Sequence, residues 1–220
     1  MDGFVTLRNV KKIYQMGEVQ IMAAAGIDFE IQRGEFAVVV GPSGAGKTTV
    51  LNILGGMDTA TEGGVLVDGE DIAKFSQKQL TAYRRDDIGF VFQFYNLVPN
   101  LTALENVELA LQICKDPMDA QTVMEEVGLG DRVANFPAQL SGGEQQRAAM
   151  ARLLLKPCEL ILADEPTGNL DPQNKEKVYE LLKEMNVQGK TVIIVTHDME
   201  LAKRCDRILV MDEGKLSTAA

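Results

Sequence analysis

The sequence is poor in the residues that bind structural metals. It has one histidine and three cysteines, and the cysteines lie more than 40 residues apart. Structural zinc sites need cysteine or histidine ligands in closely spaced pairs, so this distribution argues against zinc binding. We expect Cys114, Cys158 and Cys205 to be reduced, mostly buried thiols.

Long apolar runs are also missing. The longest are about five residues, as at positions 36–40, whereas a helix needs about 20 apolar residues to cross a bilayer. An acidic Asp2, in place of a basic stretch followed by an apolar one, does not fit a secretory signal. We therefore expect no membrane span in this chain and a cytosolic location.

Basic residues are in the minority, with 22 Lys and Arg against 32 Asp and Glu and a formal net charge of −10. This charge repels phosphate backbones, so we expect no nucleic-acid partner. With 45% hydrophobic and 25% charged residues, the composition is that of a globular protein and excludes collagen, coiled coil or disorder as a description of the whole chain.

Short apolar runs alternate with amphipathic helical patterns. The predicted strands are residues 4–10, 27–31, 36–40, 65–67, 89–92, 160–163, 192–195 and 208–211, and the predicted helices are residues 47–57, 144–155, 172–185 and 199–204. Four of the strands are nearly all apolar, as in strands buried on both faces. The alternation predicts an α/β fold with a parallel sheet. Residues 101–155 break this rhythm and indicate an inserted helical segment.

A glycine-rich loop follows the apolar run at 36–40. It fits the phosphate-loop pattern G-x-x-x-x-G-K-[ST] with Gly41, Pro42, Ser43, Gly44, Ala45, Gly46, Lys47 and Thr48. Glycines let successive backbone N–H groups surround an anion, and the helix that follows directs its positive end at the same point. Lys47 would add a full charge near the β- and γ-phosphates, and the Thr48 hydroxyl would bind Mg²⁺.

Two acids and the one histidine follow other apolar runs. Asp164 and Glu165 come after residues 160–163, and His197 comes shortly after residues 192–195. The carboxyl ends of parallel strands open onto one crevice, where ligands bind. There Asp164 would hold Mg²⁺, Glu165 would polarise the water that attacks the γ-phosphate, and His197 would donate to a γ-phosphate oxygen. A solvated acidic turn and a purely structural histidine are the simpler alternatives.

Residues 140–147 read Leu-Ser-Gly-Gly-Glu-Gln-Gln-Arg. Ser141 could cap a helix while Gly142 and Gly143 expose backbone N–H groups at its positive end, which is the design of an anion site. The motif has no role in a minimal phosphate-loop enzyme, and an ordinary helix cap explains it equally well when it is considered alone.

Together these motifs resemble the nucleotide-binding subunit of ATP-binding cassette (ABC) transporters. The resemblance covers residues 4–216 and includes six motifs in the order typical of that family. Besides the motifs above, Gln93 after Phe-Val-Phe matches the glutamine loop, and Asp171 in Asn-Leu-Asp matches the D-loop. Tyr14 stands where the family stacks an aromatic ring on adenine. Thr48 and Thr49 replace a more usual Ser-Thr pair, which keeps the hydroxyl.

The resemblance implies an α/β phosphate-loop NTPase fold with a mainly parallel sheet core, an N-terminal antiparallel β subdomain and an inserted α-helical subdomain. Residues 1–220 would form a single ABC ATPase domain, with core and β subdomain in 1–100 and 156–220 and the helical subdomain in about 101–155. In the family two subunits bind head to tail around ATP and Mg²⁺. Ser141, Gly142 and Gly143 would then serve the partner's nucleotide. Asp171 would also bind nucleotide, and Gln93 would reach toward Mg²⁺ and the attacking water.

Within the family the motifs are most similar to a branch with lipoprotein-release, macrolide-export, antimicrobial-peptide-resistance and cell-division ATPases. This implies an ATPase at the cytoplasmic face of the membrane, with a permease partner that has four helices and a large extracytoplasmic domain. Residues 94–108 would contact that partner. Residues 109–129 are shorter than is usual in the branch. The alternative is a soluble ABC-type ATPase of DNA repair or translation, but residues 48–140 contain no heptad run and no metal cluster.

Overall fold

The larger of two β-sheets forms the centre of the protein. The computed structural model describes residues 3–112 and 118–218, and this sheet has the strand order β10-β9-β3-β8-β7-β6. Neighbours from β9 to β6 pair in parallel, and β10 pairs antiparallel with β9. The strands are β3 (Phe36–Val40), β6 (Ile88–Val91), β7 (Leu160–Asp164), β8 (Thr191–Thr196), β9 (Arg207–Asp212) and β10 (Lys215–Thr218). The predicted parallel α/β sheet is therefore confirmed.

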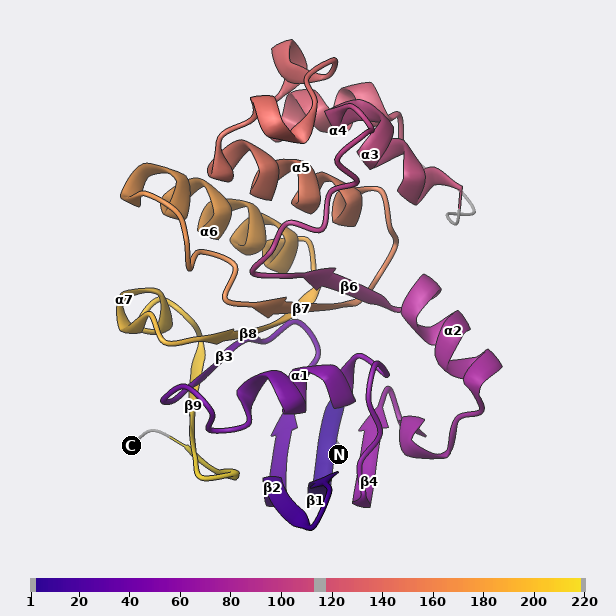
Figure 1. The fold of residues 1–220 in the computed structure, drawn as a ribbon, viewed down its shortest axis with the longest axis vertical. Coiled ribbons are helices and arrows are strands. Elements are labelled where there is room, and N and C mark those ends of the chain that lie inside the picture. Colours follow the sequence, from indigo (N-terminus) through magenta and orange to yellow (C-terminus); the bar gives the residue numbers. More distant parts are fainter. Residues whose placement is uncertain (1–2, 113–117, 219–220) are drawn as a thin grey trace.

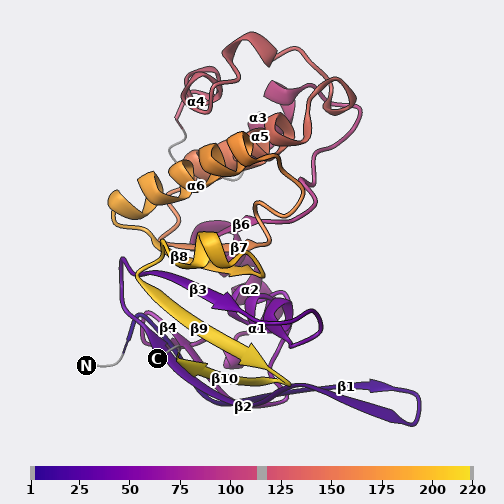
Figure 2. The same cartoon turned by 90° about the vertical axis from the view of Figure 1, so that its left-hand side faces the viewer.

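A smaller antiparallel sheet lies at the lower end of the molecule in Figure 1, with the order β2-β1-β4-β5. Its strands are β1 (Val5–Met16), β2 (Val19–Ile31), β4 (Glu62–Val67) and β5 (Glu70–Asp71). Strands β1 and β2 form a long projecting hairpin (Figure 2). The predicted strands at 4–10 and 27–31 were too short, because register shifts after Leu7 and Val10 interrupt the alternation of buried and exposed residues.

Seven α-helices occur in the described residues. All except α2 lie where the sequence predicted a helix, apart from small differences in length, or within residues 101–155. They are α1 (Lys47–Leu54), α2 (Gln77–Asp86), α3 (Ala103–Leu111), α4 (Ala120–Glu126), α5 (Gly142–Leu154), α6 (Pro172–Val187) and α7 (Met199–Ala202). Helix α1 ends earlier than predicted because Gly55 and Gly56 follow it, the latter at φ +63°. The described part of residues 101–155 contains helices and 3₁₀ turns and no strand.

Helix α2 was not predicted. It buries only Leu80 and Tyr83, and most of its other residues are polar, so it has too few apolar residues to mark it as a helix. The signal that could have found it is the capping box of Ser76 and Gln79, in which each residue bonds the backbone N–H of the other.

The larger sheet separates two hydrophobic cores. Alternate residues of β3 point to opposite faces: Ala37 and Val39 pack against α1 and the smaller sheet, and Phe36 and Val38 pack against α5 and α6. A third core joins α3, α4 and α5. Burial of apolar surface on both faces fixes the sheet as the middle layer, so its carboxyl-end loops are held in fixed positions.

Two of the three cysteines lie in the described residues. Cys158 is buried as predicted, Cys205 is half-buried, and Cys114 lies outside the described residues. No helix in residues 3–112 or 118–218 is long and apolar enough to cross a bilayer.

Candidate functional site

A cavity of about 720 Å³ opens at the carboxyl ends of β3, β7 and β8. Most of the residues that the sequence singled out line it, together with Ile21 and Ala23 of β2, which were not predicted. The lining consists of Tyr14, Ile21, Ala23, Ser43, Gly44, Gly46, Lys47, Thr48, Thr49, Gln93, Asp164, Glu165 and His197. The topology thus brings together the phosphate loop, the acid pair, the glutamine and the histidine.

The glycine-rich loop connects β3 to α1 and lies directly against β2 and β9. A Cβ atom on Gly41 would lie 2.0 Å from the carbonyl oxygen of Met211, and one on Gly46 would lie 2.1 Å from that of Ala23. Gly46 also has φ +101°, a conformation that side-chain-bearing residues rarely adopt. Glycine is therefore required at both positions for the loop to fit between the two strands.

Helix α1 begins without a side-chain cap. Its N-cap is Gly46, and in the described residues no side chain caps the backbone N–H groups of its first turn. The other described α-helices are all capped by their own side chains: Ser76, Thr102, Asp119, Ser141, Asp171 and Asp198. The first N–H groups of α1 therefore remain available to an anion, at the positive end of the helix dipole.

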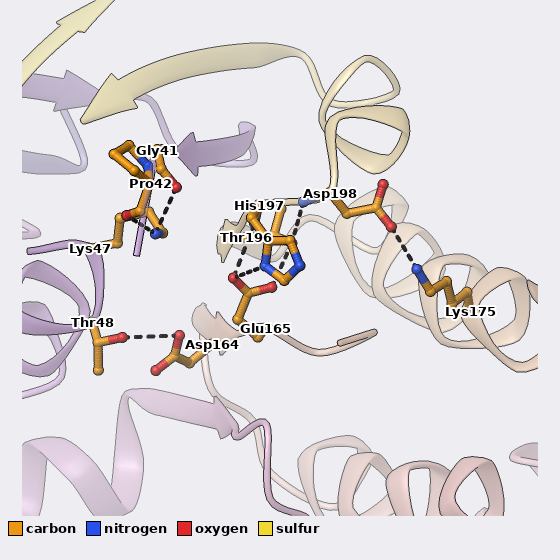
Figure 3. A network of polar contacts seen from close by, with 10 residues as sticks. All are labelled: Gly41, Pro42, Lys47, Thr48, Asp164, Glu165, Lys175, Thr196, His197 and Asp198. Atoms are coloured by element: carbon orange, nitrogen blue, oxygen red, sulfur yellow. Dashed lines mark hydrogen bonds and ion pairs between the residues drawn. The ribbon is translucent and has the colours of Figure 1, made fainter. Parts of the chain in front are cut away.

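Lys47 and Thr48 extend this anion site toward β7 (Figure 3). The Lys47 side chain is only 8% exposed, and its Nζ donates to the carbonyls of Gly41 and Pro42 at 2.9 Å each. The Thr48 hydroxyl donates to Oδ1 of Asp164 at 3.3 Å. Burial, reinforced by the neighbouring Glu165 charge, raises the pKa of Asp164 above its ordinary value, although Thr48 and Lys47 act in the opposite direction.

Glu165 is held in a strained backbone conformation by several hydrogen bonds. Its φ is +45°, uncommon for a residue other than glycine, and its N–H donates to the Val195 carbonyl at 2.8 Å. Its Oε2 accepts from the Thr196 hydroxyl at 2.8 Å, and its Oε1 accepts from the His197 N–H at 3.0 Å. The His197 Nδ1 lies 2.8 Å from the same Oε1. These contacts aim the carboxylate into the cavity.

Thr196, Asp198 and Lys175 support the Glu165 carboxylate and were not predicted (Figure 3). The fully buried Thr196 hydroxyl accepts from the Asp198 N–H at 3.0 Å while donating to Glu165. Asp198 in turn accepts from Lys175 Nζ of α6 at 3.0 Å. Thr196 and Asp198 could have been suspected because they flank His197, but nothing in the sequence distinguishes Lys175 from other surface lysines.

Tyr14 lies on β1 at the far side of the cavity. Its hydroxyl donates to Oδ2 of Asp58 at 2.7 Å, and Lys12 bonds the other oxygen of the same carboxylate. Its partner in the β1–β2 register is Ile21, which also lines the cavity. Burial raises the pKa of Tyr14, so the phenol stays protonated, and its ring offers a flat aromatic face to a ligand.

Ser141, Gly142, Gly143 and Asp171 do not line this cavity. Ser141 caps α5 through a capping box with Glu144, which is the simple helix-cap interpretation of that motif. Asp171 caps α6 by accepting from the backbone N–H groups of Gln173 and Asn174. Within one chain, these four residues therefore lie outside the cavity that the other predicted residues share.

Comparisons with known proteins give a consistent result. The family described as "ABC transporter" matches residues 24–168. The lipoprotein-releasing system ATP-binding protein LolD of Shewanella frigidimarina is 44% identical over 225 residues, covering 100% of this chain and 94% of that protein. The macrolide export ATP-binding/permease protein MacB of Brucella melitensis is 43% identical over 96% of this chain but only 34% of its own length.

A solved structure is similar over nearly its whole length. It is a dimeric structure of a post-hydrolysis state of the ATP-binding cassette MJ0796, bound to ADP and Pi. The two chains have a TM-score of 0.89 at 44% identity, covering 97% of this chain and 98% of that chain.

We predict that removing the Asp164 carboxyl stabilises the ligand-free protein at neutral pH. Because the folded-state pKa of Asp164 is raised, folding favours the protonated form, and stability falls as pH rises through that pKa. Asp164→Asn should therefore have a higher free energy of unfolding than the native protein at pH 8, and this gain should shrink toward about pH 4. Urea unfolding at both pH values measures the difference.

Glu180→Gln, a change at an exposed position on α6, serves as the control and should alter stability by less than about 0.5 kcal/mol. An Asp164→Asn variant that is less stable than the native protein at pH 8, or equally stabilised at both pH values, would contradict the expected role of burial.

Proposed function

The chain belongs to the ABC transporter family, and on that premise we propose how its residues bind and hydrolyse ATP to drive a membrane permease. It is an ATP-binding subunit with ATPase activity. The observation that carries the proposal is the uncapped start of α1, which shares a cavity with Lys47, Asp164, Glu165 and His197. This role is better supported than that of a DNA-repair or translation ATPase, because the named relatives are transport proteins.

The nucleotide would bind with its phosphates on the loop and its base on Tyr14. Backbone N–H groups of the loop at residues 41–48 and of the first turn of α1, which includes Thr49, would surround the β- and γ-phosphates. Lys47 would exchange its bonds to two loop carbonyls for phosphate oxygens, a stronger charge-assisted contact. The adenine would stack on the Tyr14 ring, which is held in place by the hydrogen bond from the Tyr14 hydroxyl to Asp58.

The donor set fits Mg²⁺. Thr48 supplies a hydroxyl 3.3 Å from the Asp164 carboxylate, and Gln93 lines the same cavity. These are hard oxygen ligands, and Mg²⁺ takes few of them from protein and the rest from water and phosphate. When bound, the ion would neutralise charge on the β- and γ-phosphates.

Glu165 would position the attacking water. The Thr196 hydroxyl and the His197 N–H each donate a hydrogen bond to one of its two oxygens, so the carboxylate is oriented before substrate binds. The His197 side chain is 71% exposed. When its ring is protonated, Nδ1 can donate to Glu165 and Nε2 to a γ-phosphate oxygen, which would make His197 a sensor of that phosphate.

A second copy of the chain would complete each site. Ser141, Gly142 and Gly143 lie at the start of α5, outside the cavity of their own chain. A head-to-tail dimer would bring this helix end, and Asp171, to the γ-phosphate held by the other subunit. The dimeric state of the similar cassette supports this arrangement.

The permease partner would transmit the motion of this dimer across the membrane. The macrolide export relative carries ATP-binding and permease functions in one longer chain, which supports a permease beside this chain. We propose four membrane helices and a large extracytoplasmic domain for that partner, and residues 94–108 as its contact. Phe94 is 73% exposed within that segment. The subunit would then act at the cytoplasmic face of the membrane.

Blocking hydrolysis should trap a closed dimer. Glu165→Gln keeps the size of the side chain but cannot activate water, so the variant should bind ATP and form dimers in sedimentation experiments. Adding Ser141→Arg to it should leave ATP binding by the same chain intact and abolish the dimer, because the arginine would obstruct the nucleotide of the other subunit. Adding Lys47→Ala should prevent ATP binding itself. A Glu165→Gln variant that stays monomeric with ATP and Mg²⁺ would refute the dimer.

The partner can be identified with the same trapped form. Tagged Glu165→Gln protein, incubated with ATP and Mg²⁺, should recover a four-helix membrane protein from detergent-solubilised native cells, identified by mass spectrometry. Tagged Lys47→Ala protein is the control and should recover less of it. If both recover only soluble repair, chromosome or ribosomal proteins, the proposed permease is wrong.

A further inference from the structure

Helix α5 connects the Ser141–Gly143 end to the turn that follows Glu165. Gly142 and Gln146 are four residues apart on the helix, so they lie on the same face, roughly 6 Å apart along its axis. Gln146 is 1% exposed, and its Nε2 donates to the Pro166 carbonyl at 2.9 Å. Pro166 directly follows Glu165, so one buried hydrogen bond connects α5 to the residue next to the strained one.

Two buried polar atoms at this contact are unusual. The Gln146 Oε1 and the Thr167 Oγ1 have no hydrogen-bond partner among the described residues. Both residues are only 1% exposed, so these atoms are also shielded from solvent. Buried polar atoms are nearly always paired, and an apolar residue would fill the same space without this penalty. The polar amide at position 146 is therefore a poor choice for packing alone.

The turn itself depends on outside support. Glu165 has φ +45°, its carbonyl accepts from the Gly168 N–H at 3.1 Å, and proline restricts the residue before it. A strained conformation persists only where several contacts hold it. Gln146 supplies such a contact from α5, in addition to the bonds that β8 and the residue after it supply.

We propose that Gln146 is a positioning residue that links the Ser141–Gly143 end of α5 to Glu165 of the same chain. The inference rests on the proposed function, in which that helix end binds the nucleotide of the other subunit. A shift of α5 when the second nucleotide binds would move the Pro166 carbonyl and, with it, the Glu165 carboxylate. Each subunit would then hydrolyse its ATP according to the state of the other site, which couples the two sites.

Helix α5 has other attachments that do not involve Gln146. The neighbouring Arg147 donates to the Val127 carbonyl at 3.0 Å and to Oδ1 of Asn174 at 2.7 Å. These bonds should keep α5 in place when Gln146 is changed, so the link to Pro166 can be removed without detaching the helix.

The test compares Gln146→Met and Gln146→Asn with Gln121→Met in the full chain. Methionine keeps the length and removes the donor, and asparagine keeps the amide and shortens its reach. Gln121 lies on α4, and its amide contacts only Glu125 in the described residues, so it controls for the chemical change. If one position-146 variant fails to fold, as judged by its melting curve, the other carries the test.

For both Gln146 variants we expect kcat to fall roughly 10- to 100-fold, as when a reacting group is slightly misplaced. The Kd for ATP should stay unchanged, and the Hill coefficient for ATP in the hydrolysis assay should fall from above 1 to about 1 as the sites lose coupling. In a Glu165→Gln background, both variants should still form ATP-dependent dimers. Gln121→Met should behave like the native protein in all of these measurements.

Two results would overturn the inference: a kcat and Hill coefficient equal to those of Gln121→Met, or a loss of ATP binding or dimerisation that matches the loss of kcat. The second result would mean that Gln146 is merely structural. Failure of the Glu165→Gln protein with native Gln146 to dimerise would instead overturn the proposed function, so the two failures can be distinguished.

Discussion

The site depends on the uncapped amino end of α1. A glycine-rich start leaves the first N–H groups of α1 and the positive end of its dipole exposed. In each of the other described α-helices, a serine, threonine or aspartate side chain caps the amino end. Strands β3, β7 and β8 are parallel and hydrogen-bonded neighbours, so the loops after them meet at that helix end. The acids and the histidine at these strand ends are thereby brought to the place where an anion binds.

Function at this point conflicts with stability. Asp164 is partly buried beside another carboxylate, and Glu165 has a backbone conformation that most residues avoid. Such features cost folding free energy and persist because the surrounding structure holds them. Thr196, the His197 N–H and the Val195 carbonyl bond Glu165, and Gln146 of α5 bonds the carbonyl of the residue that follows it. The same contacts that maintain the strain are suited to transmit movement.

The sequence was sufficient to predict the parallel sheet and most of the residues that line the cavity, because buried apolar strands and a phosphate loop have strong local patterns. It was insufficient for the β1–β2 hairpin, where bulges break the period of two, and for α2, which buries little apolar surface. The role of Lys175 depends on a contact between elements distant in the sequence, so no local pattern could indicate it. Ile21 was missed because only the register of the hairpin, which the sequence did not predict, places it opposite Tyr14.

If each ATP site is shared between two chains, thiol cross-linking should join the phosphate loop of one chain to the start of α5 in the other. With the three native cysteines changed to alanine and Glu165→Gln added, one protein would carry Ser43→Cys in the phosphate loop and the other Ser141→Cys at the start of α5. With ATP, Mg²⁺ and a short bifunctional thiol reagent, we expect a cross-linked dimer in the mixture and little in either protein alone. Cross-linking of the Ser141→Cys protein to itself, with none specific to the mixture, would contradict a head-to-tail dimer.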